Sequence, residues 1–154
     1  MNKRTFAIPV LGATGLCLAT ACSSGDPLEG AWELTSFADG QVFQDLPIYT
    51  DSGDNSYEKF GSIVIGDALQ GAMVMITYAD DYYGSRSETR SAVMDGTETG
   101  KRTYSIETRG SFQMSLDCEI AKNDDGDDEL SCSGEQFNLQ SASLTAVRFD
   151  DSDE

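Results

Sequence analysis

The chain of 154 residues contains no histidine. Histidine is the side chain most often used as a general base and is a common metal ligand, so Ser-His-Asp triads and histidine-ligated metal sites are excluded. No glycine-rich phosphate loop precedes a helix pattern. Carboxylates are so numerous that no single pair stands out as a catalytic acid and base. We therefore expect no enzymatic activity, no cofactor and no metal.

Basic residues are also scarce, because 10 Lys and Arg stand against 27 Asp and Glu, a formal charge of −17. Nucleic-acid binding requires patches of Lys and Arg, so nucleic acid is excluded as a partner. The first interpretation of the acid excess is solubility, or adaptation to a salty habitat. The alternative is attraction to a basic partner protein. We expect the chain to be a monomer.

Long apolar runs are missing as well. A transmembrane helix needs ~20 apolar residues, whereas the longest run here, residues 6–18, is short and is interrupted by proline and glycine. It follows two basic residues and leads to the small residues 19–21. This order of basic, apolar and small residues is typical of a secretory signal peptide. Residues 1–21 are thus predicted to be cleaved.

The segment Leu18-Ala19-Thr20-Ala21-Cys22 resembles the bacterial lipobox. In the lipoproteins that carry this motif, the cysteine is lipidated and becomes the mature N-terminus. The resemblance implies that Cys22 carries the lipid, with palmitate among the acyl chains, and that the protein lies in the cell envelope. Ser23 after the cysteine implies the outer membrane in a cell that has one. The alternative is an ordinary secreted protein cut near Ala21.

Cleavage would leave 8 basic and 27 acidic residues, a formal charge of −19. Anionic lipid should repel such a domain, so the acyl chains must supply the attachment, and two or more chains anchor stably. Residues 22–27 are predicted to be a lipidated tether, whose last five residues span at most ~18 Å. We expect the folded domain over residues 28–149 and an acidic tail over residues 150–154.

Cysteine is nearly absent from the predicted domain, which keeps only Cys118 and Cys132. An even pair in an oxidising compartment predicts one disulfide. Residues 112–120 alternate strictly between apolar and polar side chains, which predicts a strand with Cys118 on its buried face. An antiparallel register centred on Asp125 places Cys118 opposite Cys132, where a bridge can form.

The acidic segment 123–129 lies between the two cysteines and invites comparison with a calcium-binding loop. When Gly126 is aligned with the glycine of an EF-hand, the first and twelfth positions are Ala121 and Cys132, so both required carboxylates are missing. We interpret the segment as a solvated hairpin tip whose charges discourage edge pairing. An irregular calcium site is the alternative.

No helical pattern follows the tether, and the domain is instead a series of short β-rich runs separated by turn residues. Strands are predicted near residues 29–37, 60–66, 72–79, 88–94, 101–108, 111–121, 129–137 and 142–149. Eight short strands with close turns predict a single all-β, antiparallel barrel or sandwich. Residues 38–59 are expected to form one long polar connection.

The strands on either side of Gly110 are predicted to form a hairpin with a three-residue loop, which sets Ile106 opposite Phe112. Tyr104, Ile106, Phe112 and Met114 then point inward, and they are the speculative binding residues for a small apolar ligand. An eight-stranded barrel is either filled by its own side chains or holds one ligand. A hollow interior would favour ligand carriage, whereas a filled barrel with an exposed aromatic patch would favour protein binding.

The first predicted strand opens with Gly30-Ala31-Trp32, and the last strand carries Arg148. A Gly-x-Trp at the start of an eight-stranded antiparallel chain resembles the lipocalin-like (calycin) group. The resemblance implies a barrel that Trp32 closes at one end, with Arg148 packed over its ring. It also implies a non-catalytic domain that binds a small apolar ligand or serves as a surface module.

The segment from Tyr104 to Gly110 looks like the Tyr-x-x-x-Thr-Lys/Arg-Gly pattern of periplasmic C-type lysozyme inhibitors, which are also small β-barrel lipoproteins. Ser133-Gly134-Glu135-Gln136-Phe137 loosely resembles their Ser-Gly-x-x-Tyr motif, although here it follows the other motif instead of preceding it. The alternative function is therefore a protein-binding inhibitor of a basic enzyme such as C-type lysozyme.

Two tyrosines, Tyr82 and Tyr83, stand in a predicted connection between two strands. We expect them to pack partly over the rim of the barrel. The alternative is that they help to form a binding surface, because tyrosine offers a large amphipathic face.

Overall fold

The computed structural model describes residues 25–39 and 42–149. The predicted signal peptide, the lipidation site Cys22 and the acidic tail 150–154 lie outside the described residues. In the described part of the chain, no helix is both long enough and apolar enough to cross a membrane.

The described residues form strands joined by short turns. The strands are β1 (Gly30–Asp39), β2 (Val42–Asp45), β3 (Ile48–Ser52), β4 (Asn55–Ile65), β5 (Gln70–Asp81), β6 (Gly84–Gly100), β7 (Thr103–Gly110), β8 (Met114–Lys122), β9 (Asp128–Gln136) and β10 (Ser141–Arg148). One 3₁₀ turn, η2 (Asp67–Leu69), joins β4 to β5.

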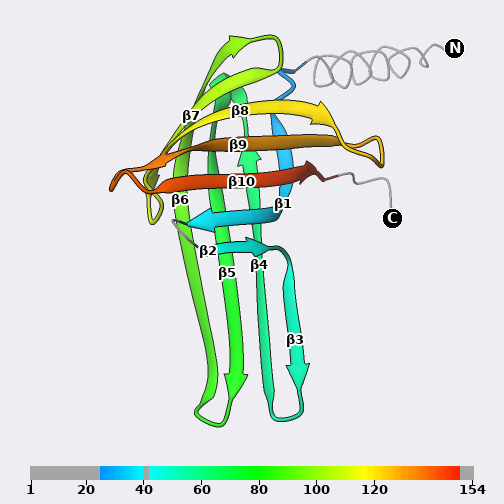
Figure 1. Cartoon of the computed structure of the whole chain (residues 1–154), viewed down its shortest axis with the longest axis vertical. Helices are drawn as coiled ribbons and strands as arrows, with labels where there is room; N and C mark the ends of the chain where they lie inside the picture. Colours follow the sequence, from blue (N-terminus) through cyan, green and yellow to red (C-terminus); the bar gives the residue numbers. More distant parts are fainter. Residues whose placement is uncertain (1–24, 40–41, 150–154) are drawn as a thin grey trace, which may run out of the picture.

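Eight strands close into an antiparallel barrel in the order β1-β10-β9-β8-β7-β6-β5-β4, as Figure 1 shows. The closing contact pairs the first half of β1 with the end of β4, from Gly30 opposite Ile65 to Glu33 opposite Ser62. β2 and β3 pair outside the barrel, with the other halves of β1 and β4. The predicted all-β fold and the predicted eight-stranded barrel are confirmed.

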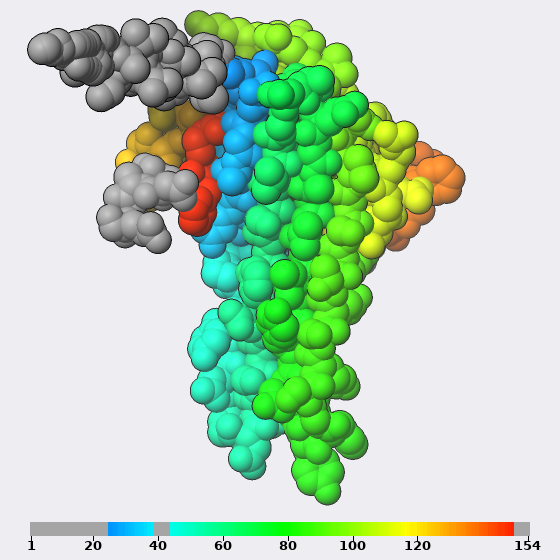
Figure 2. Space-filling view, turned by 180° about the vertical axis from the view of Figure 1, so that it is seen from behind, coloured from blue at the N-terminus to red at the C-terminus, as the bar shows by residue number. Residues whose placement is uncertain are grey.

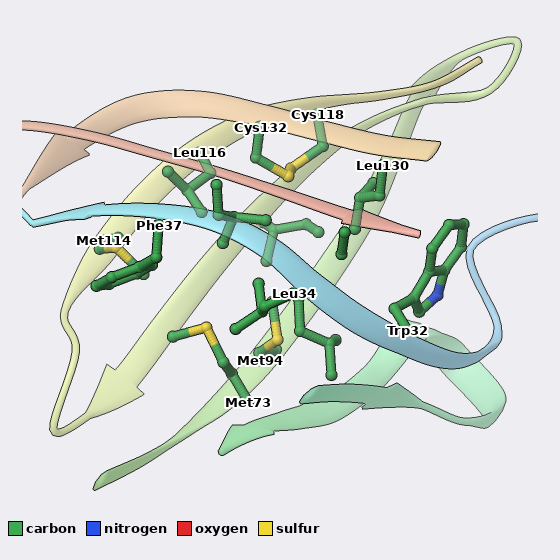
Figure 3. Packing of buried hydrophobic residues seen from close by; sticks show 14 of the residues in the cluster. Trp32, Leu34, Phe37, Met73, Met94, Met114, Leu116, Cys118, Leu130 and Cys132 are labelled. Atoms are coloured by element: carbon green, nitrogen blue, oxygen red, sulfur yellow. A yellow bond between two sulfur atoms is a disulfide. The ribbon is translucent and has the colours of Figure 1, made fainter. Parts of the chain in front are cut away.

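The core fills the space that the barrel encloses, and every strand of the wall contributes to it (Figure 3). The alternating residues of each strand point inward, as the period of two requires. Each large apolar side chain buried in this way stabilises the fold by about 1.5–3 kcal/mol. The largest fully buried side chains are Trp32, Tyr104, Leu28, Leu34, Ile63, Met73, Met94, Ile106, Leu116, Leu130 and Leu144.

The prediction of one long connection over residues 38–59 is wrong. This segment contains the end of β1, both strands outside the barrel, and the start of β4. Most side chains of β3 and of residues 55–60 are exposed or half-buried. A sheet that meets water on both faces lacks the alternation of apolar and polar residues on which sequence reasoning relies.

The predicted hairpin register is also wrong, because Ile106 pairs with Leu116 and not with Phe112. β7 continues to Gly110 along β6, and residues 111–113 form the connection. The Thr108 hydroxyl donates a hydrogen bond to the Phe112 carbonyl (2.8 Å) and accepts one from the Met114 amide (3.0 Å). Both registers place the same residues inward, so alternation alone could not distinguish them.

β3, β4, β5 and β6 extend beyond the barrel as a four-stranded sheet, visible at the bottom of Figure 1. We call residues 48–60 and 76–90 the arm. Its tip carries Tyr82 and Tyr83, which are 92% and 85% exposed. The expectation that these tyrosines pack over the barrel rim is therefore wrong, because the strands continue past the rim before they turn.

Gly134 is a position where the sheet leaves no room for a side chain. A Cβ atom at Gly134 would lie 1.9 Å from the backbone oxygen of Ser115. Gly134→Ala is expected to lower the free energy of unfolding by about 3 kcal/mol, because backbone cannot move aside as a flexible side chain can. Urea unfolding measures the loss. The matched control is Gly66→Ala, where the nearest atom would be 3.8 Å away, and an equal loss in both variants would contradict the prediction.

Candidate functional site

One end of the barrel is closed by Trp32 and Arg148, which face each other on paired strands. The Arg148 guanidinium lies 4.2 Å from the centroid of the Trp32 ring. The indole is almost completely buried, and its Nε1 donates a hydrogen bond to the Leu28 carbonyl (3.0 Å). A guanidinium stacked on an indole gains about 0.5–2 kcal/mol. The predicted packing of Arg148 over the Trp32 ring is thus present in the structure.

Arg148 also holds the segment that enters the barrel. Its Nη1 donates to the Glu29 carbonyl (2.7 Å), its Nη2 donates to the Pro27 carbonyl, and its Nε lies 3.4 Å from a carboxylate oxygen of Asp128. Gly30 has a φ of +126°, and a Cβ there would lie 2.7 Å from Nη1 of Arg148. Glycine is therefore needed at position 30 both for the backbone angle and for the space that the arginine occupies.

Tyr104 fixes the same segment from the opposite wall. Its hydroxyl donates a hydrogen bond to Asp26 Oδ1 (2.7 Å), which also accepts one from the Leu28 amide (2.9 Å). Burial of the Tyr104 ring and the hydrogen bond to Asp26 raise the pKa of the phenol well above its usual range. The chain is thus bound to the barrel from Asp26 onward, so the last two residues of the predicted tether, Asp26 and Pro27, are held by the barrel.

Asp128, at the start of β9, lies close to three cationic side chains. Arg102 Nη2 lies 2.7 Å from its carboxylate and Lys122 Nζ lies 3.1 Å away, in addition to Arg148. Burial raises the pKa of Asp128, but Lys122 and Arg102 outweigh burial and hold the pKa below its usual value. The carboxylate is therefore ionised at neutral pH and ties β9 to its neighbours.

The neighbouring tip, residues 123–127, is closed by hydrogen bonds from its backbone amides to the Asn123 side chain. Asn123 Oδ1 accepts hydrogen bonds from the amides of Asp125 (3.0 Å) and Asp127 (2.9 Å). The tip side chains are mostly exposed. Within the described ranges, no group of three or more Asp, Glu, Cys or His residues is placed to hold a metal ion.

The predicted disulfide joins Cys118 and Cys132, which lie opposite each other on β8 and β9. Both cysteines face the core and are 4% exposed. The predicted register is confirmed, since Ile120 also lies opposite Leu130. Figure 3 shows the bridge on the inner side of the wall.

The four residues proposed from the sequence as ligand contacts lie in the packed interior. Tyr104, Ile106, Phe112 and Met114 are between 0% and 4% exposed and belong to the core cluster. The grooves that the structure describes open on the outside of the molecule, and each is lined in part by exposed side chains. Tyr104 and Met114 also line two of these grooves, so the grooves are candidate binding surfaces.

The outer face of the arm is the most distinctive of these outside surfaces. The inward residues of the barrel part of β4 have odd numbers, so the even-numbered residues of the arm part of β4 form its outer face. Across the strands, this outer face carries Tyr49, Asp51, Glu58, Phe60, Ile76, Tyr78 and Asp80. The rings of Phe60 and Tyr78 have their centroids 6.1 Å apart. Figure 2 shows this side of β4, β5 and β6 running without a break from barrel to arm.

The basic residues of the arm lie on its other face. Lys59, Arg86 and Arg90 have the parity of the inward residues of their strands. Arg86 forms an ion pair with Asp81, and Lys59 donates a hydrogen bond to Gln44. Among the described residues, the outer face of the arm is therefore both aromatic and purely acidic.

Sequence reasoning missed this face because it treated most of its residues as a connection or as strand ends. Glu58, Phe60, Ser62 and Val64 share one face of β4 and mix polar with apolar side chains, so the sequence offers no alternation that would mark this face as a strand. In the sequence, a long strand that leaves the barrel has the same pattern as a short strand followed by a polar loop.

Comparisons with known proteins add no relative: no family model, no curated protein and no solved structure matches the chain.

Proposed function

We propose that this protein is a lipid-anchored, non-catalytic module of the cell envelope that binds a basic protein through the outside of a filled, lipocalin-like barrel. The observation that carries the proposal is the outer face of the arm, where aromatic rings and carboxylates are exposed together without a basic residue. Exposed aromatic side chains in a contiguous patch are typical of interaction sites. The carboxylates add charge complementarity to a basic partner.

The filled interior supports binding on the outside over carriage of a small ligand. The closed eight-stranded barrel is compatible with ligand binding in general. However, its own side chains meet in the middle, and the residues proposed as ligand contacts are packed among them. A ligand inside would have to displace this packing, which costs several kcal/mol.

The position of the arm also suits an anchored module. The first described residues lie at the end of the molecule opposite the arm tip, as Figure 1 shows. A lipid on Cys22 would therefore hold the closed end of the barrel near the membrane and direct the arm away from it. The proposed partner would then bind away from the anionic lipid surface, which repels the acidic domain.

A second candidate is inhibition of a basic enzyme such as C-type lysozyme. The observation in its favour is a groove of about 400 Å³, which brings Thr108 and Arg109 of one inhibitor-like segment beside Glu135 and Phe137 of the other. The two segments thus meet in space although their order is reversed. This candidate predicts that excess pure protein lowers the activity of C-type lysozyme. Unchanged lysozyme activity would exclude it.

Photocrosslinking from the arm tests the main proposal. A photoreactive phenylalanine analogue at Tyr49, which is 71% exposed, is expected to yield one discrete adduct with a basic protein in intact cells of the native host. The analogue at Ser133, which is exposed on the wall of the barrel, is the control and should yield none. Asp51→Asn together with Asp80→Asn should reduce the Tyr49 adduct several-fold. Equal adducts from both positions would refute the proposal.

A further inference from the structure

We propose that a groove between β1 and β4 is the part of this surface that recognises an arginine side chain of the partner. The inference rests on the proposed function and gives the chemistry of the partner at one site. The groove has a volume of about 490 Å³ and lies where β1 and β4 separate below their closing contact. Two phenylalanines, two glutamates and Trp32 are among its lining residues.

The aromatic part of the groove is formed by Phe60 and Phe149. Phe60 is half-buried on the outer face of β4, and Phe149 is 59% exposed directly after β10. The Phe149 amide donates a hydrogen bond to the Ala31 carbonyl (2.9 Å), which fixes the backbone beside the groove. Exposed phenylalanine rings offer their negative faces to a cation.

The charged part of the groove is formed by Glu33 and Glu58. Glu33 lies opposite Ser62, and Glu58 is four residues from Ser62 on the same outer face of β4. Phe60 therefore lies between the two carboxylate positions, about 7 Å from each along the strand direction. Neither glutamate side chain forms an ion pair or a hydrogen bond with any described residue.

A guanidinium matches this arrangement better than an ammonium does. It is planar, so it stacks on an aromatic ring, and its fork of donors binds a carboxylate in its own plane. Arg148, which stacks on Trp32, does not take this role because it is engaged with Asp128 and with the carbonyls of Pro27 and Glu29.

The source of the arginine is a polypeptide and not a small free cation. Carboxylate and aromatic side chains continue from the groove along the outer face of the arm, through Tyr78 to Asp80. An extended basic segment can place one arginine in the groove and further cationic residues along the arm, whereas a small molecule would leave most of this surface unused.

Calorimetric titration of the purified mature chain tests the inference. The probe is a capped peptide of alternating arginine and glycine. Glu33→Gln combined with Glu58→Gln is expected to weaken its binding at least about tenfold, since a lost charge-assisted hydrogen bond is worth about that factor. Phe60→Leu, which removes the ring but stays apolar, should weaken binding about threefold to tenfold.

Asp117→Asn combined with Glu119→Gln is the matched control for charge. Both residues are exposed on the outside of β8, so this variant removes the same two charges away from the groove. It should change the affinity less than twofold. If it weakens binding as much as the double variant of Glu33 and Glu58 does, the attraction is only that of an acidic protein and the inference fails. A peptide with citrulline in place of arginine that binds equally well would overturn it as well.

Choline distinguishes the two sources of a cation. Tighter binding of choline than of the arginine peptide, lost in Phe60→Leu, would show a small-molecule site and overturn the polypeptide assignment. Failure of this titration and failure of the proposed function are distinguishable, because the photocrosslink from Tyr49 depends on Asp51 and Asp80, which lie outside the groove.

Discussion

Cys22→Ser is expected to move the protein from the membrane fraction to the soluble fraction, because the substitution removes the proposed site of the acyl chains. The charge of the mature chain would oppose any residual attachment to anionic lipid. Two or more acyl chains hold a protein on a membrane stably, whereas their loss leaves no comparable anchor. Ultracentrifugation of lysed host cells followed by detection of the protein measures the change.

The released domain should stay folded, since its described contacts begin at Asp26, four residues after Cys22. Asp26 is bound by Tyr104, and Arg148 holds the carbonyls of Pro27 and Glu29. The thermal unfolding midpoint is therefore expected to be unchanged. The matched control is Cys17→Ser, which alters a cysteine of the predicted signal peptide and should leave the protein in the membrane fraction. Full retention of Cys22→Ser in the membrane fraction would contradict the lipid anchor.

Removing the disulfide should have a large effect on stability. Replacing both Cys118 and Cys132 by alanine is expected to lower the free energy of unfolding by about 3 kcal/mol, because a closed loop of this length restricts the unfolded chain by that amount. The two cysteines are separated by 14 residues, and both lie in the core. Urea unfolding followed by fluorescence of Trp32 measures the loss, since the chain has one tryptophan.

A reductant separates the loss of the covalent bridge from the loss of packing. Addition of the reductant should destabilise the native protein by a similar amount and should leave the double variant unchanged. Two freely reactive thiols in the native protein before reduction would refute the bridge. Similar unfolding midpoints for native protein and double variant would show that the bridge adds little to the barrel.

The consequences of these two experiments differ in kind. Loss of the lipid would change where the arm is displayed, without altering the arm itself. Loss of the disulfide would act on β8 and β9, on the part of the barrel away from the arm (Figure 1). The arm is held in place by β4, β5 and β6, which continue into it from the barrel wall. A binding surface built in this way can keep its shape while it stays open on both faces.

The sequence by itself determined the strands that line the core, because burial imposes a period of two on them. Residues 112–120 show this most clearly: their alternation predicted which side chains are buried, and it placed Cys118 opposite Cys132. The Gly-x-Trp at the start and the arginine at the end predicted the closing pair of Trp32 and Arg148. The signal peptide and Cys22 stay predictions that come from the sequence alone.

Only the tertiary structure decided the features that burial does not mark. The pairing of Ile106 with Leu116 follows from where β7 ends, and alternation is the same in either register. The arm is solvated on both faces, so nothing in its composition separated strands from a polar connection. The groove brings together Phe60 of β4 and Phe149 after β10, with Glu33 and Glu58 on either side of Phe60, only because the barrel closes between β1 and β4.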